Sequence, residues 1–319
     1  MSALDLYYSV KPFIPWRVRM GLRRWHARWL RRRREHEWPI KSGSQRRPDG
    51  WPGWPGDKKF ALVLTHDVED QKGLDRCWLL HELDRDMGFR SAFYFVPEGA
   101  YRAPDLLRED LRAEGCEVGV HDLHHDGKLY RSLASFKAQA DRINHYLDKW
   151  NANGFRSGFM HHNLDWLHEL NLDYDGSTFD TDPFEPQPDG VNTIFPFWVP
   201  KAGLDSDAGY VELPYTLPQD STLFIVLQEP SIEIWQRKVN WIAEHGGMVL
   251  LNTHPDYMSF GPGPAGRDEY PVERYGQFLD WIRSVHKGAY WSALPSEVAR
   301  LCAKARTSFP DVSCVRSGH

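Results

Sequence analysis

Acidic and imidazole side chains follow two apolar segments of this chain in a pattern that suits metal chemistry. Asp67 and Glu69 stand at the end of one apolar run, and His121 and His125 stand four residues apart at the end of another. Zinc binds neutral imidazoles together with carboxylates, and a catalytic zinc site uses about three protein ligands and leaves a position open. The sequence therefore predicts a divalent metal site, with zinc preferred, made by the two histidines and one of the two acids.

Two further residues could complete a hydrolytic site. His254 closes the apolar segment 248–253, where an imidazole could protonate a leaving amine or alkoxide. Arg156 lies in the apolar segment 154–159 and could orient a carboxylate base through a bidentate contact that keeps the base ionised.

Short apolar segments alternate with helical patterns from Lys58 onward, which predicts βαβ crossovers and a parallel sheet. About seven such units favour an α/β fold with a distorted, incomplete (β/α)7-type barrel over an open, doubly wound sheet. The predicted strands are 60–68, 91–96, 116–123, 154–159, 211–216, 222–227, 248–253 and 289–292. The predicted helices are 74–87, 103–114, 132–150, 163–170, 232–245, 272–285 and 296–305. A polar, proline-rich stretch at 180–207 is expected to form a loop or hairpin insertion near the mouth of the barrel.

The composition is that of an ordinary soluble globular protein, with 41% hydrophobic and 26% charged residues among 319. Four cysteines without close spacing indicate free thiols rather than a disulfide framework or a zinc knuckle. The chain has no apolar run near 18 residues and no apolar core of a signal peptide at its N-terminus. A cytoplasmic protein is the expectation.

The N-terminal region differs from the rest in charge. Residues 1–50 carry 13 Lys and Arg against 4 Asp and Glu, although the whole chain has a net charge of −5. Residues 16–34 contain nine arginines and no acid, with Val18, Leu22, Trp25 and Trp29 at helical spacing on one face. Such a helix could lie on an anionic membrane, peripheral to an inner membrane, or could pack its Trp face on the acidic domain. Nucleic-acid binding has less support.

The segment 42–57 is rich in Gly, Pro and Trp and is expected to be a linker or a strap over the domain. We therefore divide the chain into a basic helix and linker (1–57), a catalytic domain (58–305) and a C-terminal tail (306–319).

The order of these motifs resembles the polysaccharide deacetylase superfamily, carbohydrate esterase family 4, also called the NodB homology domain. Thr65-His66-Asp67-Val68-Glu69 looks like the family's Thr-Phe-Asp-Asp motif in the variant that separates the two acids, a variant associated with surface polysaccharide gene clusters. Glu117-Val118-Gly119 and His121 to His125 match the second motif, with Asp122 in place of the hydroxyl residue. Arg156-Ser157-Gly158-Phe159 retains the Arg of the third motif, and the segment 250–254 matches the fifth.

The resemblance implies a role for each matching residue. Asp67 would be the general base, Glu69 the metal-binding acid beside His121 and His125, and His254 the general acid. Arg156 would hold the base. The fourth motif contributes an Asp, for which the candidates are Asp175, Asp180 and Asp182, with Asp175 preferred.

The resemblance also implies an enzyme: a metal-dependent hydrolase that removes acetyl groups from N-acetylated sugars of a surface polysaccharide or its precursor. One alternative is a hydrolase of another non-peptide C–N bond on the same fold. A second is an inactive glycan-binding or scaffold protein. The expected partner is a carbohydrate and not a nucleic acid.

Overall fold

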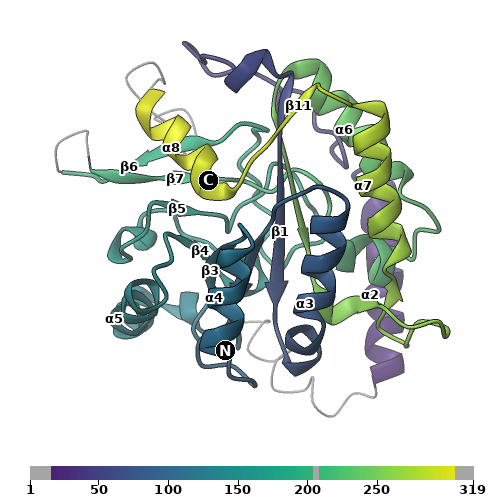
Figure 1. The fold of residues 1–319 in the computed structure, drawn as a ribbon, viewed down its shortest axis with the longest axis horizontal. Helices are drawn as coiled ribbons and strands as arrows, with labels where there is room; N and C mark the ends of the chain where they lie inside the picture. Colours follow the sequence, from purple (N-terminus) through teal and green to yellow (C-terminus); the bar gives the residue numbers. More distant parts are fainter. Residues whose placement is uncertain (1–15, 204–207, 306–319) are drawn as a thin grey trace.

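A computed structural model describes residues 16–203 and 208–305 and shows one curled sheet at the centre (Figure 1). Its strands follow the order β11-β1-β2-β3-β4-β5-β7-β6. Strand β8 pairs with the edge of β1 opposite to the edge that β11 and β2 share. The strands are β1 (Phe60–Val68), β2 (Ala92–Phe95), β3 (Glu117–His121), β4 (Gly154–Arg156), β5 (Tyr174–Asp175), β6 (Phe197–Pro200), β7 (Gly209–Glu212), β8 (Met248–Thr253) and β11 (Tyr290–Ser292). All neighbours pair in parallel except β6 and β7. A separate parallel pair joins β9 (Met258–Ser259) to β10 (Tyr270–Pro271).

Strand β1 lies in the middle of the core. Ala61 pairs with Trp291 of β11 on one side and with Met248 of β8 on the other, and all nine residues of β1 are buried. A parallel strand covered on both faces needs apolar residues throughout rather than in alternation, which explains the unbroken run before Thr65. The carboxyl ends of β1, β3 and β8 consequently meet at one end of the sheet.

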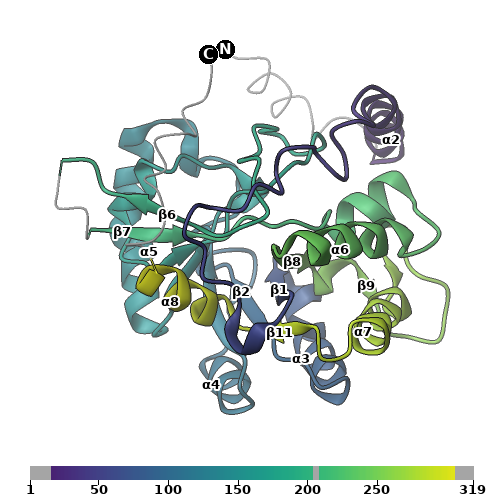
Figure 2. The same ribbon diagram turned by 90° about the horizontal axis from the view of Figure 1, so that it is seen from above.

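Helices cover the outside of the sheet, and Figure 2 shows α3, α4, α6 and α7 around it. The helices are α2 (Trp16–Arg33), α3 (Gln71–Asp86), α4 (Asp105–Ala113), α5 (Leu133–Lys149), α6 (Glu233–His245), α7 (Glu273–Val285) and α8 (Pro295–Ala305). Shorter turns of helix are η2 (Pro55–Asp57), η3 (Leu129–Arg131), η4 (Gly158–Met160), η5 (Trp166–Glu169), η6 (Ser221–Leu227) and η7 (Pro255–Tyr257). This confirms the predicted α/β fold with an incomplete, curled barrel.

One predicted strand is wrong. The segment predicted as a strand at 222–227 is the π-helix η6, whose residues 222–227 are all buried. A short apolar run that is buried on every side has no periodicity that separates strand from helix. The expected insertion does form a hairpin, because β6 pairs antiparallel with β7 at its end.

The Trp-rich segment before β1 is a strap. Trp51 and Trp54 are both buried, and their rings contact Phe195 and Trp291 respectively. Trp54 Nε1 also donates to the carbonyl of Gly246 at 2.8 Å. These contacts tie the segment across the domain and decide between the two predicted roles.

Helix α2 packs on the domain with the face opposite its tryptophans. Met20 and Ala27 are buried in the core, whereas Trp25 and Trp29 are exposed. The alternative that the Trp face covers the acidic domain is therefore wrong. No helix within the described ranges is long and apolar enough to cross a bilayer.

Candidate metal centre and active site

Strand β1 divides its polar side chains between two faces. Successive residues of a strand point to opposite faces, so Thr65 and Asp67 share one face and His66 points to the other. The ring nitrogens of His66 lie 2.7 Å from Thr253 Oγ1 and 2.8 Å from Asp84 Oδ2, on the side of helix α3. His66 is thus fully paired outside the site, and Asp67 faces the interior of the barrel.

Asp67 is held by an arginine and an amide. Arg156 Nη1 donates to Oδ1 of Asp67 at 3.0 Å, and Asn252 Nδ2 donates to Oδ2 at 2.7 Å. Arg156 thus contacts the Asp67 carboxylate through one nitrogen, rather than through the bidentate contact that the sequence analysis expected. Burial alone would raise the pKa of Asp67, but Arg156 and the other polar neighbours outweigh it and lower the pKa. Asp67 is therefore ionised at neutral pH.

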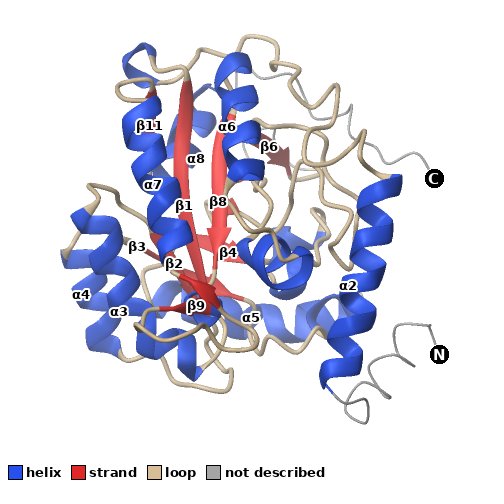
Figure 3. Ribbon diagram, turned by 90° about the vertical axis from the view of Figure 1, so that its right-hand side faces the viewer, coloured by secondary structure: helices blue, strands red, loops and turns tan. Residues whose placement is uncertain are grey.

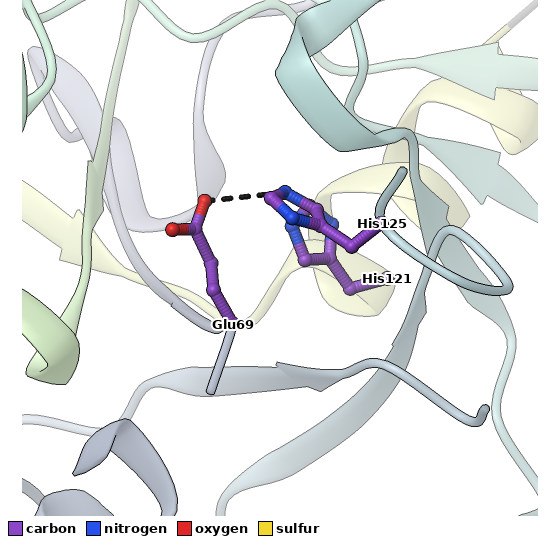
Figure 4. Close-up of side chains that lie close together, drawn as sticks. All are labelled: Glu69, His121 and His125. Carbon is purple, nitrogen blue, oxygen red and sulfur yellow. Dashed lines mark ion pairs between the residues drawn. The ribbon is translucent and has the colours of Figure 1, made fainter. Parts of the chain in front are cut away.

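Glu69, His121 and His125 converge on one point (Figure 4). One potential ligand atom from each lies within 4.8 Å of those of the other two. His125 Nε2 is 3.2 Å from Glu69 Oε1, and His121 Nε2 is 4.0 Å from Asp67 Oδ2. Neither imidazole Nε2 has a hydrogen-bond partner of good geometry among the described residues, although both are buried. Two buried imidazole nitrogens directed at a carboxylate, with no hydrogen bond of good geometry, are an arrangement that suits an ion-binding site.

The protonation of His121 suits a metal ligand. Its Nδ1 lies 3.0 Å from the carbonyl oxygen of Arg156, and a carbonyl can only accept, so Nδ1 carries the proton and Nε2 the free lone pair. Burial lowers the pKa of His121, which favours the neutral ring. Burial also disfavours charge on His125, but the negative charge of Glu69 raises its pKa. The two nitrogens and one carboxylate form a donor set that fits zinc.

The loop that carries His125 brings together Asp122 and Gly158, two positions where the sequence differs from the motifs that it resembles. Asp122 replaces the hydroxyl residue, and its carboxylate accepts from the amides of Leu123 at 2.6 Å and Gly158 at 3.2 Å. A Cβ at position 158 would lie 2.6 Å from Asp122 Oδ2 and 2.9 Å from a ring carbon of His125. A carboxylate at 122 therefore requires glycine at 158, and the two changes belong together.

His254 is paired with an acid that the sequence analysis did not select. Its Nδ1 lies 2.7 Å from Asp220 Oδ1, and its backbone N–H donates to Oδ2 of Asp220 at 2.9 Å. Its Nε2 faces the site, 3.9 Å from Asp67 Oδ2 and 3.8 Å from Glu69 Oε1. Burial would lower the pKa of His254, but Asp220 and these two acids raise it to about 10. His254 is therefore a protonated imidazolium directed at the carboxylates of Asp67 and Glu69.

Asp175, the preferred fourth-motif residue, lies elsewhere. Its carboxylate accepts from the amide of Ser177 at 2.8 Å and from its hydroxyl at 2.7 Å, and it is aligned with Glu212 on the neighbouring strand. Strand β5 is four positions from β1 in the sheet path, whereas η6 follows Asp220 and precedes β8, which pairs with β1. Asp220, and not Asp175, is therefore the aspartate that pairs with His254.

The other two aspartates considered for that motif are also engaged outside the cluster. Lys238 Nζ donates to Asp180 Oδ2 at 2.6 Å, and burial raises the pKa of Asp180 to about 6. Asp182 accepts from the hydroxyl of Tyr215 at 3.0 Å. Burial raises its pKa to about 8, with a further contribution from the neighbouring Glu185. Neither carboxylate contacts His254 in the part of the chain that the structure describes.

Residues after His254 fix the position of Glu69. The carboxylate of Asp256 accepts from the backbone amides of Glu69 at 3.1 Å and Asp70 at 2.8 Å. Tyr257 donates its hydroxyl to Glu69 Oε2 at 2.8 Å. Asp256, Tyr257 and Asn252 all flank His254, so proximity in sequence to the predicted acid was the only signal that could have found them.

Comparison with known proteins gives likeness in structure alone. No family model and no curated protein matches the sequence. A protein assigned as a polysaccharide deacetylase from Mycobacterium smegmatis aligns with a TM-score of 0.58 and 19% identity, over 81% of this chain and 94% of that one. A protein given the same assignment from Pseudomonas aeruginosa PAO1 aligns with a TM-score of 0.58 and 16% identity, over 80% and 93%. An allantoinase aligns with a TM-score of 0.61 and 16% identity, over 80% and 93%.

These likenesses define the class of fold. The chain has the polysaccharide deacetylase fold, an incomplete α/β barrel with its polar cluster at the carboxyl ends of the strands. An allantoinase shares this fold, so the fold does not by itself determine the reaction.

Proposed function

We propose that this chain is a zinc-dependent hydrolase that removes acetyl groups from N-acetylated sugars of a surface polysaccharide or its precursor. One observation carries the proposal: the buried Nε2 atoms of His121 and His125 and the carboxylate of Glu69 converge beside Asp67 and His254. Metal ligands, an ionised acid and a protonated imidazole are the parts that hydrolysis of an amide needs.

Glu69, His121 and His125 would hold the ion. A divalent cation bound there polarises an acyl carbonyl and lowers the pKa of water. This assigns Glu69, rather than Asp67, as the metal-binding acid, because both Asp67 oxygens are already engaged by Arg156 and Asn252.

Asp67 and His254 would divide the proton transfers. Asp67 is ionised and accepts the proton of the attacking water, while Arg156 keeps its carboxylate in place. The C–N bond then breaks, and His254, held protonated by Asp220, donates its Nε2 proton to the departing nitrogen. The products are acetate and a free amine, and no covalent intermediate is needed.

A second function has a specific observation behind it. The allantoinase aligns with a slightly higher TM-score than either deacetylase-like protein, so hydrolysis of a different C–N bond is the alternative for the same residues. The third possibility, a glycan-binding protein without activity, predicts that the three ligands hold no metal.

The decisive experiment measures metal in the purified protein after dialysis. We expect about one zinc ion per chain in the wild type and little in His121→Ala or His125→Ala. His124→Ala is the matched control, because His124 lies between them and its Nδ1 contacts the carbonyl of Glu98 instead. A wild type without metal would contradict the proposal and favour the inactive protein.

Product analysis then identifies the bond that is cleaved. Acetate released from N-acetylated oligosaccharides or lipid-linked sugars supports the deacetylase. Turnover of allantoin or related ureides without acetate supports the alternative. A cytoplasmic location and the absence of nucleic-acid binding stay predictions.

A further inference from the structure

Helix α2 is fixed to the domain by one face. Met20 is 9% exposed and Ala27 is 3% exposed, and both belong to the hydrophobic core. Arg24 Nε donates to the carbonyl of Ile225 at 3.1 Å, and Arg31 forms an ion pair with Glu229. These contacts lie on η6 and the turn after it, so the helix cannot roll without breaking a buried interface.

The opposite face of α2 presents an apolar stripe to solvent. Val18, Leu22, Trp25 and Trp29 are 52%, 58%, 65% and 39% exposed. Successive helical residues turn by about 100°, so these four lie within one narrow stripe, directly opposite Ala27. In Figure 3 the helix runs along the outer edge of the molecule.

Arginines border the stripe on both sides. At the same turn per residue, Arg28 and Arg32 fall on one flank and Arg19 and Arg33 on the other. Three of them are exposed, and Arg19 is half-buried. The Arg33 guanidinium lies 4.3 Å from the centre of the Trp29 ring. Residues 16–34 contain no acid, so the whole exposed face is cationic around an apolar centre.

We propose that α2 docks this protein on an anionic lipid bilayer, with the stripe Val18, Leu22, Trp25 and Trp29 in the interface and the flanking arginines on lipid phosphates. Indole rings favour the headgroup level, and arginine forms bidentate contacts with phosphate. An apolar stripe between two cationic flanks is the pattern of an interfacial helix that lies in the plane of the membrane.

Two other occupants fit the surface less well. A nucleic acid would bind the arginines but would leave four apolar side chains without a partner. A second copy of this chain would have to bring two stripes bordered by arginines together, which places like charges side by side. The lipid surface satisfies both the charge and the apolar area.

Sedimentation of the full-length protein with vesicles tests this proposal independently of any enzymatic activity. The probes are vesicles of phosphatidylcholine alone and of phosphatidylcholine with phosphatidylglycerol, at low and high salt. We expect binding to the anionic vesicles, weakened by salt because charge is screened. Trp25→Glu should lower the partition coefficient roughly tenfold or more, since it places a carboxylate in the interface.

Matched controls separate this surface from general effects. Leu106 on α4 is 72% exposed, so Leu106→Glu adds the same charge at an apolar site away from the stripe and should bind like the wild type. The double variant Arg28→Ser, Arg32→Ser should lose its preference for anionic vesicles. Arg131→Ser with Arg300→Ser, on other elements, should retain it. Thermal unfolding of each variant checks that the fold is intact.

Three outcomes would overturn the proposal. The first is equal binding of the wild type to neutral and anionic vesicles, and the second is equal loss in Trp25→Glu and Leu106→Glu. The third is a dimer in solution that Trp25→Glu dissociates, because the stripe would then be an interface between two copies.

Discussion

Two buried pairs of side chains near the ends of parallel strands, Asp67 with Arg156 and Asp175 with Glu212, differ in the direction in which the pKa of the carboxyl is shifted. Asp67 at the end of β1 and Asp175 at the end of β5 are both almost completely buried. The pKa of Asp67 is lowered, because Arg156 and other cationic neighbours outweigh burial. The pKa of Asp175 is raised, because burial outweighs its hydrogen bonds, and the pKa of its neighbour Glu212 is raised well above the usual range.

The difference lies in the partners and not in the position along the sheet. Asp67 accepts from a guanidinium, whereas the partners of Asp175 are the amide and hydroxyl of Ser177 and the acidic side chain of Glu212. Neutral donors offset part of the cost of burying a carboxylate, but a nearby positive charge is needed to keep it ionised. A strand-end acid is therefore a candidate for catalysis only when the fold brings a cation to it.

The largest expected effect is a loss of catalytic activity on substitution of Asp67 but not of Asp175. We expect Asp67→Asn to lower kcat about 10²- to 10⁴-fold without loss of zinc, because it removes the base and leaves the three ligands in place. His254→Ala should keep zinc and lose nearly all turnover as well. Asp175→Asn should stay close to wild type. Steady-state kinetics with metal analysis checks this, and full activity in Asp67→Asn would break the comparison.

Removal of the Arg156 guanidinium from Asp67 should destabilise the folded protein strongly. We expect Arg156→Met to lower the free energy of unfolding by about 3–5 kcal/mol, because it leaves Asp67 charged, buried and without its main partner. Adding Asp67→Asn to Arg156→Met should recover part of that loss. Urea denaturation measures both. If Glu212→Gln lowers the free energy of unfolding as much as Arg156→Met does, the contrast between the Asp67–Arg156 pair and the Asp175–Glu212 pair is wrong.

The pH dependence of stability should change sign between the pairs. The lowered pKa of Asp67 contributes stability above its unfolded pKa, and this is lost as the pH falls through the folded value. The raised pKa of Glu212 contributes stability below its unfolded pKa, and this is lost as the pH rises through the folded value. With a chelator present, Asp67→Asn should flatten the acidic side of the Tm profile and Glu212→Gln the alkaline side. We expect each change to be about 2 °C or more.

The smallest effect concerns the backbone that carries Glu69. A Cβ at Gly73 would lie 2.2 Å from Asp256 Oδ2, the carboxylate that accepts from the Glu69 amide. We expect Gly73→Ala to lower the free energy of unfolding by about 1–3 kcal/mol and to weaken zinc binding. Gly276→Ala in α7 meets nothing within 4 Å and should stabilise by about 0.5–1 kcal/mol. Equal melting temperatures for the two variants would show that Asp256 does not fix this loop.

Much of the fold could be predicted because its central strands are buried on both faces. The bounds of β1 and β8 agree with the sequence prediction, since continuous apolar runs that end in polar residues identify such strands. The prediction failed at η6, where the apolar run 222–227 is helical. Its length and composition suit a buried strand equally well, and only its packing under α2 decides the matter.

The sequence analysis selected four residues that the structure brings together, but not the residues that hold them in place. Glu69, His121, His125 and His254 carry chemistry that few other residues provide, so type and spacing point to them. Asp220 and Asn252 are ordinary polar residues whose partners lie 34 and 185 positions away in sequence. Nothing local marks Asp220, which was therefore not among the aspartates considered, and only proximity to His254 in sequence could have pointed to Asn252.

The sequence by itself determined which residue types stand at the ends of the buried strands, because apolar runs and the polar residues that end them are local features of the sequence. Tertiary structure alone decided which acid meets a cation, which acid meets His254, and which face of α2 remains in solvent. Each of those outcomes is a distance between segments far apart in the chain, and charge and burial take effect only once folding has set that distance.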